Sequence, residues 1–116
     1  MAKLARPERQ FTFTNGATES AEIDISDLQD ARLGIVGIKM GASWTANTGR
    51  LQYNDGSGWM DIYDEYGSVL SFVIGGASRY IALRPALYAM LEGRIRVALN
   101  SATGGARVAS LIMRPV

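Results

Sequence analysis

The sequence of 116 residues contains no histidine and no cysteine. Histidine is the commonest general base near neutral pH, and both residues are the usual ligands of zinc. Cysteine also supplies the thiol nucleophile and the disulfide bond. The sequence therefore favours a protein that is not an enzyme and needs no cofactor or metal, and its stability owes nothing to disulfides.

Long apolar runs are also missing. No stretch approaches the roughly 18 apolar residues that a membrane-spanning helix needs. The first ten residues, MAKLARPERQ, have no apolar run after their charges, so we expect no signal peptide. The pairs Gly75-Gly76 and Gly104-Gly105 lack the spacing and the following Lys-Ser/Thr of a phosphate-binding loop. We therefore expect no membrane association, and synthesis in the cytoplasm of the producing cell.

The strongest local pattern lies between residues 49 and 67. Leu51 and Tyr53 alternate with polar residues, the pair Asp55-Gly56 turns the chain, and a second apolar run follows. Period-two alternation around an Asp-Gly pair is the strongest short-range indication of a β-hairpin. The pattern predicts a strand on each side of the turn and a positive φ at Gly56.

Other strand-like segments follow at short intervals, with turn residues between them. They are Gln10–Thr14, Ser20–Ile25, Leu33–Met40, Val69–Ile74, Arg79–Leu83, Arg94–Leu99 and Val108–Met113. Leu33–Met40 is apolar at both phases, which is typical of a strand at the centre of a sheet. Ser26–Arg32 and Pro85–Leu91 carry helix-start signals and predict short connector helices. The sequence predicts one all-β domain, a single jelly-roll-like β-sandwich of about eight or nine short strands.

The charges are distributed unevenly along the chain. Residues 1–65 hold six basic and ten acidic side chains, whereas residues 66–116 hold six arginines and one glutamate. Such runs are usually solvated faces, but complementary patches can also join copies of a protein. We expect the acids of residues 19–30 of one copy to face Arg94, Arg96 or Arg107 of another, which predicts a homo-oligomer or a lattice-bound protein. We expect no nucleic-acid partner because the basic residues are scattered and the net charge is +1.

Two further groups are candidates for partner binding. Residues 1–9 form a basic N-terminal arm, with Lys3, Arg6 and Arg9, ahead of the sandwich domain at residues 10–116. This arm is either a free tail or a segment that docks on a neighbour. Trp44 and Tyr66 have polar and glycine neighbours and are expected to be exposed anchors for a protein or a sugar ring. Tyr53 and Trp59 are expected to face each other across the hairpin and pack there.

The sequence gives little support for calcium binding, glycoside hydrolysis or a serine nucleophile. Four acids within eleven residues, Asp55, Asp61, Asp64 and Glu65, leave calcium binding open as an alternative, although their spacing is not that of the twelve-residue calcium loop. Paired carboxylates also occur in glycosidases, but a tight hairpin offers no large cleft. The hydroxyls of Ser68, Ser71 and Ser78 have no histidine to activate them.

A set of framework segments runs along the chain: Phe11–Met40 (FTFTNGATESAEIDISDLQDARLGIVGIKM), Trp44-Thr45-Ala46, the hairpin, ASRYIALRP and a closing RPV. In these segments the sequence resembles small proteins of tailed bacteriophages and prophages that are encoded among virion structural genes. Those proteins often have a Trp-Arg-Tyr strand where this chain has GRIRV at residues 93–97, so no function built on those aromatics is expected. The hairpin Leu51–Tyr63 is also similar to one in discoidin-like and other jelly-roll modules that bind carbohydrate or protein.

These resemblances imply a non-enzymatic virion structural protein, located on the capsid as a decoration protein or at the head–tail region. Its partners would be phage capsid or other virion proteins, and it would act by multivalent protein–protein adhesion. The alternative is a carbohydrate-binding module for host attachment, in which Trp44, Trp59 and Tyr66 contact a glycan.

Overall fold

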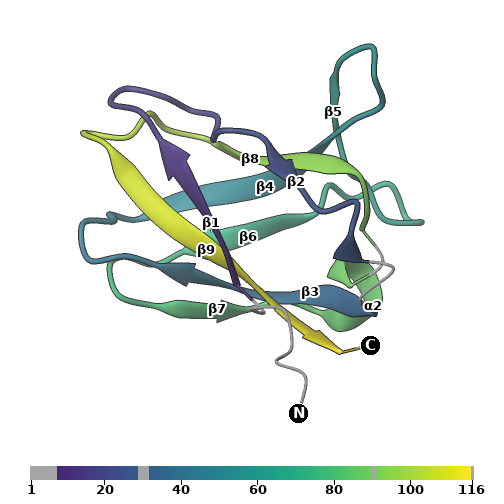
Figure 1. Ribbon diagram of the computed structural model, residues 1–116. Coiled ribbons are helices and arrows are strands. Elements are labelled where there is room, and N and C mark those ends of the chain that lie inside the picture. Colours follow the sequence, from purple (N-terminus) through teal and green to yellow (C-terminus); the bar gives the residue numbers. More distant parts are fainter. Residues whose placement is uncertain (1–7, 29–31, 90, 116) are drawn as a thin grey trace.

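The computed structural model describes residues 8–28, 32–89 and 91–115. The chain forms two antiparallel sheets that pack face to face (Figure 1). Within the described residues the elements are β1 (Glu8–Phe13), β2 (Ile23–Asp24), β3 (Leu33–Met40), β4 (Asn47–Asn54), β5 (Trp59–Asp61), β6 (Ser71–Ile74), β7 (Tyr80–Ala82), α2 (Pro85–Tyr88), β8 (Arg94–Leu99) and β9 (Arg107–Pro115). In this part of the chain no helix has the length and apolar character needed to cross a membrane.

The strand order is that of a jelly roll. The first sheet runs β1-β9-β3-β7, and the second runs β2-β8-β4-β5, with β6 also paired to β4. Each strand from the first half of the chain thus pairs with its counterpart from the second half: β1 with β9, β2 with β8, β3 with β7 and β4 with β6. A long hairpin that wraps around itself into two sheets has this pairing, which confirms the predicted jelly-roll-like sandwich.

The core lies between the two sheets and is built from alternating inward side chains. On β1, Phe11 and Phe13 face the interior, while Gln10 and Thr12 are exposed. β3 lies between β9 and β7, which confirms the central position expected from its apolar sequence. The largest fully buried side chains are Phe13, Ile25, Leu28, Ile35, Ile38, Leu51, Ile74, Ile95, Val97, Leu111 and Met113.

Several predicted elements have different bounds in the structure. β1 begins at Glu8, so Glu8 and Arg9, which were assigned to the N-terminal arm, belong to the sandwich. The helix predicted from Pro85 ends at Tyr88, after one turn in which the backbone N–H groups of Leu87 and Tyr88 donate to the carbonyl of Arg84. The helical turn predicted over residues 26–32 includes residues 29–31, which lie outside the described residues.

The strand predicted over Ser20–Ile25 is shorter because a side chain replaces one backbone partner. The N–H of Ser20 donates to the carbonyl of Val97 at 2.8 Å, but the N–H of Val97 donates to the hydroxyl of Ser20 at 2.9 Å. Ser20 is buried, and its hydroxyl itself donates to the carbonyl of Ala21 at 2.8 Å. Regular pairing therefore resumes only at β2, where Ile23 lies opposite Ile95.

The predicted hairpin is formed by β4 and β5, and it projects beyond the rest of the sandwich at the upper right of Figure 1. Gly56 has a φ of +99°, as expected from the Asp-Gly pair, and its N–H donates to the side-chain oxygen of Asn54 at 2.8 Å. Trp59 lies opposite Asn54, and Tyr53 lies opposite Met60. The prediction that Tyr53 and Trp59 face each other is therefore wrong, because the two residues point to opposite faces of the sheet.

The turn provides a direct test of backbone strain. Replacing Gly56 with valine is expected to lower the free energy of unfolding by about 1–2 kcal/mol, because a β-branched residue tolerates a positive φ poorly. Gly58 is the matched control, since it lies in the same turn outside the positive-φ region and, like Gly56, has open space where a Cβ would stand. Urea denaturation of both variants measures the difference. Equal stabilities of the Gly56→Val and Gly58→Val proteins would contradict the assignment of strain to Gly56.

Candidate partner-binding surface

The residues predicted to bind partners are not gathered at one place. Lys3 and Arg6 lie outside the described residues. Arg9 is in β1, Arg94 and Arg96 are in β8, and Tyr66 is in the segment between β5 and β6. Trp44 lies between β3 and β4 and is only 5% exposed.

The prediction that Trp44 is an exposed anchor is wrong. Its indole packs edge-on against Phe13, with ring centroids 5.3 Å apart, and its Nε1–H donates to the carbonyl of Val108 at 2.8 Å. The connection between β3 and β4 therefore places Trp44 across strands β1 and β9, where the ring belongs to the core. Polar neighbours in the sequence suggested exposure, but they did not reveal this long-range packing.

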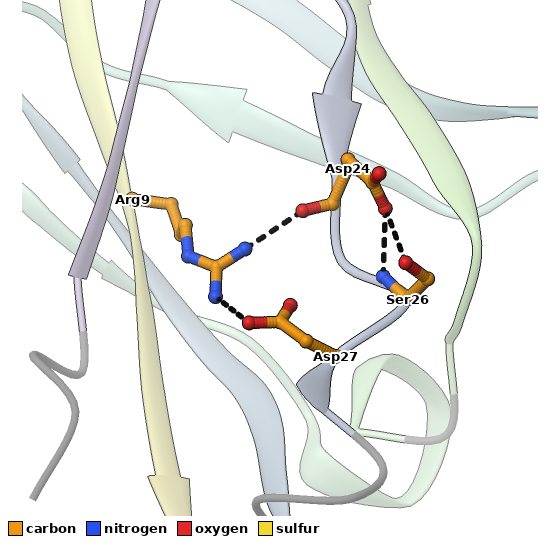
Figure 2. A network of polar contacts seen from close by, with 4 residues as sticks. All are labelled: Arg9, Asp24, Ser26 and Asp27. Atoms are coloured by element: carbon orange, nitrogen blue, oxygen red, sulfur yellow. Dashed lines mark hydrogen bonds and ion pairs between the residues drawn. The ribbon is translucent and has the colours of Figure 1, made fainter.

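Arg9 is bound within the molecule instead of being part of a free arm (Figure 2). Its Nη1 donates to the carbonyl of Asp24 at 2.7 Å, and its Nη2 donates to Oδ2 of Asp27 at 2.7 Å. Oδ1 of Asp24 in turn accepts from the hydroxyl of Ser26 at 2.7 Å and from its N–H at 2.9 Å. The hydrogen bond from Arg9 lowers the pKa of Asp27, and those from Ser26 lower the pKa of Asp24. Arg9 thus ties β1 to the segment after β2.

The acidic segment and the arginines, which are far apart in the sequence, meet in the same molecule. β2 pairs with β8, so Asp24 lies opposite Arg94, and Oε2 of Glu22 is 3.8 Å from Nε of Arg94. Both side chains of this ion pair are largely exposed, and exposed pairs contribute little to stability. Arg94 and the acidic segment are therefore neighbours within one molecule, whereas the sequence predicts a contact between copies.

A polar network covers the outer face of the second sheet. Arg50 and Gln52 point outward from β4, and Asp61 lies opposite Gln52 on β5. Oδ1 of Asp61 accepts from Nε2 of Gln52 at 2.9 Å and from Nε of Arg50 at 2.8 Å. These two hydrogen bonds lower the pKa of Asp61. The carboxylate thus neutralises Arg50 and also fixes the orientation of the Gln52 amide.

Arg96 extends this network from the other side of β4. It lies opposite Gln52 on β8, and its Nε donates to Oε1 of Gln52 at 2.7 Å. Its guanidinium carbon is 4.4 Å from the centroid of the Trp59 ring, which is a cation–π arrangement. In Arg94–Leu99 the two arginines alternate with apolar residues, which predicts that Arg94 and Arg96 point to solvent. In the structure Arg96 is half-buried. Alternation along β8 predicts the outward direction of Arg96. Its contact with Trp59 depends on the sheet order, in which β8 and β5 lie on either side of β4.

Tyr66 stands on a short turn that is held by several hydrogen bonds. Oδ1 of Asp64 accepts from the N–H groups of Tyr66 and Ser68, each at 2.9 Å. The N–H of Asp64 donates to the carbonyl of Ser68 at 2.8 Å, and Gly67 provides the positive φ that the turn needs. We call residues 64–68 the tyrosine turn. The side chain of Tyr66 is 86% exposed, so the prediction of its exposure is confirmed.

Large apolar side chains are exposed around the tyrosine turn. Tyr63 directly precedes it and is bridged to Val69 on the returning side, and the ring of Tyr63 is more than half exposed. Met60, on β5, is also exposed. Exposed single apolar residues are ordinary, but neighbouring aromatic ones are typical of surfaces that bind another molecule.

Three of the acids considered for calcium binding, Asp55, Asp61 and Asp64, accept hydrogen bonds in three separate places. Oδ1 of Asp55 accepts from the N–H and the hydroxyl of Ser57, while Asp61 and Asp64 have the partners given above. Among the described residues, no group of three or more metal-ligating side chains comes together. The carboxylates therefore serve three local structures and do not converge on a single ion.

Shallow hollows lie at one end of the first sheet, around Gly41. Hollows of about 390, 200 and 160 Å³ all include this residue. The largest is lined by Lys39, Met40, Gly41, Ala42, Ser78, Arg79 and Tyr80. Ser78 also lines this hollow, whose charged residues are Lys39 and Arg79.

The sequence matches no family model and none of the curated proteins with which it was compared. Among solved structures, the chain is similar to the crystal structure of the SPBc2 prophage-derived protein YomS. The two chains share 16% sequence identity, and the similarity covers 98% of this chain and 99% of the other with a TM-score of 0.51. At this level of identity the comparison establishes a shared fold.

Proposed function

We propose that the protein is a non-enzymatic structural component of a phage particle, which binds capsid or other virion proteins by multivalent adhesion. The shared fold with a prophage-derived protein supports the phage origin. Jelly rolls are common in viral capsids and in lectins, so the fold suits a binding role without requiring one. A position on the capsid exterior or at the head–tail region provides the repeated neighbours that the proposal needs.

The observation that carries this proposal is the rigid presentation of Tyr66. An aromatic side chain that is 86% exposed buries a large area when it is covered by a partner. The hydrogen bonds of Asp64 already fix its backbone, so binding orders little more than the side chain itself. Tyrosine is among the residues that contribute most to protein–protein binding energy.

Repetition makes a small contact of this kind sufficient. A single interface around one turn is weak, because stable interfaces bury on the order of 1,200–2,000 Å². On a particle, however, many copies bind at once, and linked contacts raise the overall affinity by about 10²–10⁴. Homo-oligomers on the particle would provide this linkage.

The Tyr66→Ala variant tests the proposal. We expect the parent protein to co-sediment with purified particles in many copies, and Tyr66→Ala to reduce the retained amount by about tenfold, because a buried tyrosine anchor contributes more than about 1 kcal/mol. The matched control is Val73→Ala, which removes an exposed apolar side chain from β6. Both variants should unfold at the same temperature as the parent.

Two results would contradict the proposal. One is the absence of the protein from particles, and the other is equal retention of the Tyr66→Ala and parent proteins. A glycan array provides the comparison with the carbohydrate-binding alternative, for which burial of Trp44 removes one of the three predicted aromatic contacts. Micromolar glycan binding that is lost in Tyr66→Ala would replace adhesion by host attachment.

A further inference from the structure

We infer that Arg96, held by Trp59 and Gln52, binds a carboxylate group of an acidic side chain on the partner protein. This inference deepens the proposed function and rests on it. It concerns the outer face of the second sheet, where a cation is held in a fixed orientation.

The first argument is charge. Within residues 8–28, 32–89 and 91–115, the ion pairs are Arg9–Asp27, Arg50–Asp61 and Arg94–Glu22. Arg96 takes part in none of these, although it is half-buried. Removing a cation from water is costly unless an anion compensates it. A carboxylate from a partner would provide that compensation when the face is covered.

The second argument is geometry. Gln52 must point its oxygen toward Arg96, because its Nε2 donates to Asp61. The bond to Gln52 uses Nε of Arg96, and Trp59 covers one face of the guanidinium. The two Nη groups form a fork that matches the two oxygens of a carboxylate. Since the guanidinium is already oriented, less conformational entropy is lost on binding.

The surroundings favour a protein partner over a sugar acid or a nucleic acid. A small sugar acid is usually held in a concave site by several polar groups, whereas Arg96 and Trp59 lie on the outer face of a sheet, opposite Gln52 and Asn54 of β4. On this face Asp61 is paired with Arg50, and Glu22 is paired with Arg94. Arg96 therefore offers one further positive charge, which matches a single carboxylate better than a polyanionic backbone.

The experiment is an NMR titration of the full chain with acidic probes. The signals are the Nε–H of Arg96 and the indole N–H of Trp59, and the buried indole of Trp44 is an internal control. The probes are a capped tetrapeptide with one glutamate among glycines, its counterpart with glutamine at that position, and glucuronate. We expect saturable shifts of Arg96 and Trp59 with the glutamate peptide at millimolar affinity, none with the glutamine peptide, and weaker binding of glucuronate.

Two variants of Arg96 and one of its neighbour complete the design. Arg96→Gln should abolish the response, and Arg96→Lys should weaken it about tenfold, because lysine keeps the charge but loses the fork. Arg94→Gln is the matched control on the same face of the same strand and should respond like the parent. Equal losses in the Arg94 and Arg96 variants, tighter binding of glucuronate, or no saturation by about 10 mM would overturn the inference.

Co-sedimentation with particles separates this inference from the proposed function. We expect Arg96→Gln to be retained less than Arg94→Gln. Full retention of Arg96→Gln, together with the loss of its response to the glutamate peptide, would overturn the partner assignment and leave the proposed function standing. Failure of the parent protein to join particles would overturn the proposed function, and with it the identity of the partner.

Discussion

Replacing Trp44 with alanine is expected to lower the free energy of unfolding by about 3–5 kcal/mol, the range for a buried aromatic residue. The variant loses the edge-on contact with Phe13 and leaves a cavity between the sheets. It also leaves the carbonyl of Val108 without the indole donor. Since domains of this size are stable by only about 5–15 kcal/mol, much of the total stability would be lost.

Urea denaturation measures this loss, and two variants define its origin. Trp44→Phe keeps most of the ring contact and loses the hydrogen bond, so it should cost less than Trp44→Ala. Tyr66→Ala removes an aromatic ring of similar size from the surface and should leave the stability unchanged within about 0.5 kcal/mol. A cost below about 1 kcal/mol for Trp44→Ala would contradict the buried position of the indole.

Replacing Gly49 with alanine is expected to cost about 1–3 kcal/mol, because the new Cβ would overfill the core. That Cβ would lie 2.7 Å from two ring carbons of Phe72, which pairs with Gly49 across β4 and β6. Phe72 is only 7% exposed, so its ring cannot move away without displacing the core. Thermal or urea denaturation measures the cost.

Gly37 is the matched control for this effect. A Cβ there would lie 2.5 Å from the hydroxyl oxygen of Tyr80, an even closer approach. Tyr80 is 54% exposed, however, so its ring can rotate into solvent. Gly37→Ala is therefore expected to cost well under about 1 kcal/mol. If both alanines cost the same, burial of the opposing ring does not determine the penalty.

Local patterns predicted the strands well because they depend on neighbouring residues. The alternation around Asp55-Gly56 predicted the hairpin and the positive φ, and the apolar run Leu33–Met40 predicted a central strand. The polar setting of Tyr66 correctly indicated exposure, because the tyrosine turn is held by its own residues, 64–68. The same reasoning was wrong for Trp44, whose partners are Phe13 and Val108.

The candidate surface was only partly predictable, because it joins strands that are distant in the sequence. Alternation indicated that Arg96 points outward, but nothing local showed that Gln52 and Trp59 would hold it. Arg9 has the sequence setting of a free arm, yet residues 15 and 18 positions later bind its guanidinium. Contacts of this kind follow from strand order, which a single sequence leaves undetermined.

The pairing of early strands with late ones also affects how the protein is made. β1 has its sheet neighbour in β9, so the first strand to leave the ribosome must wait for the last strand of the described chain. At about 5–20 residues per second, that delay lasts several seconds or more. Contacts between distant segments are also slow to form after synthesis. We therefore expect this fold to assemble after translation, and its early strands to be most vulnerable to aggregation while the chain is incomplete.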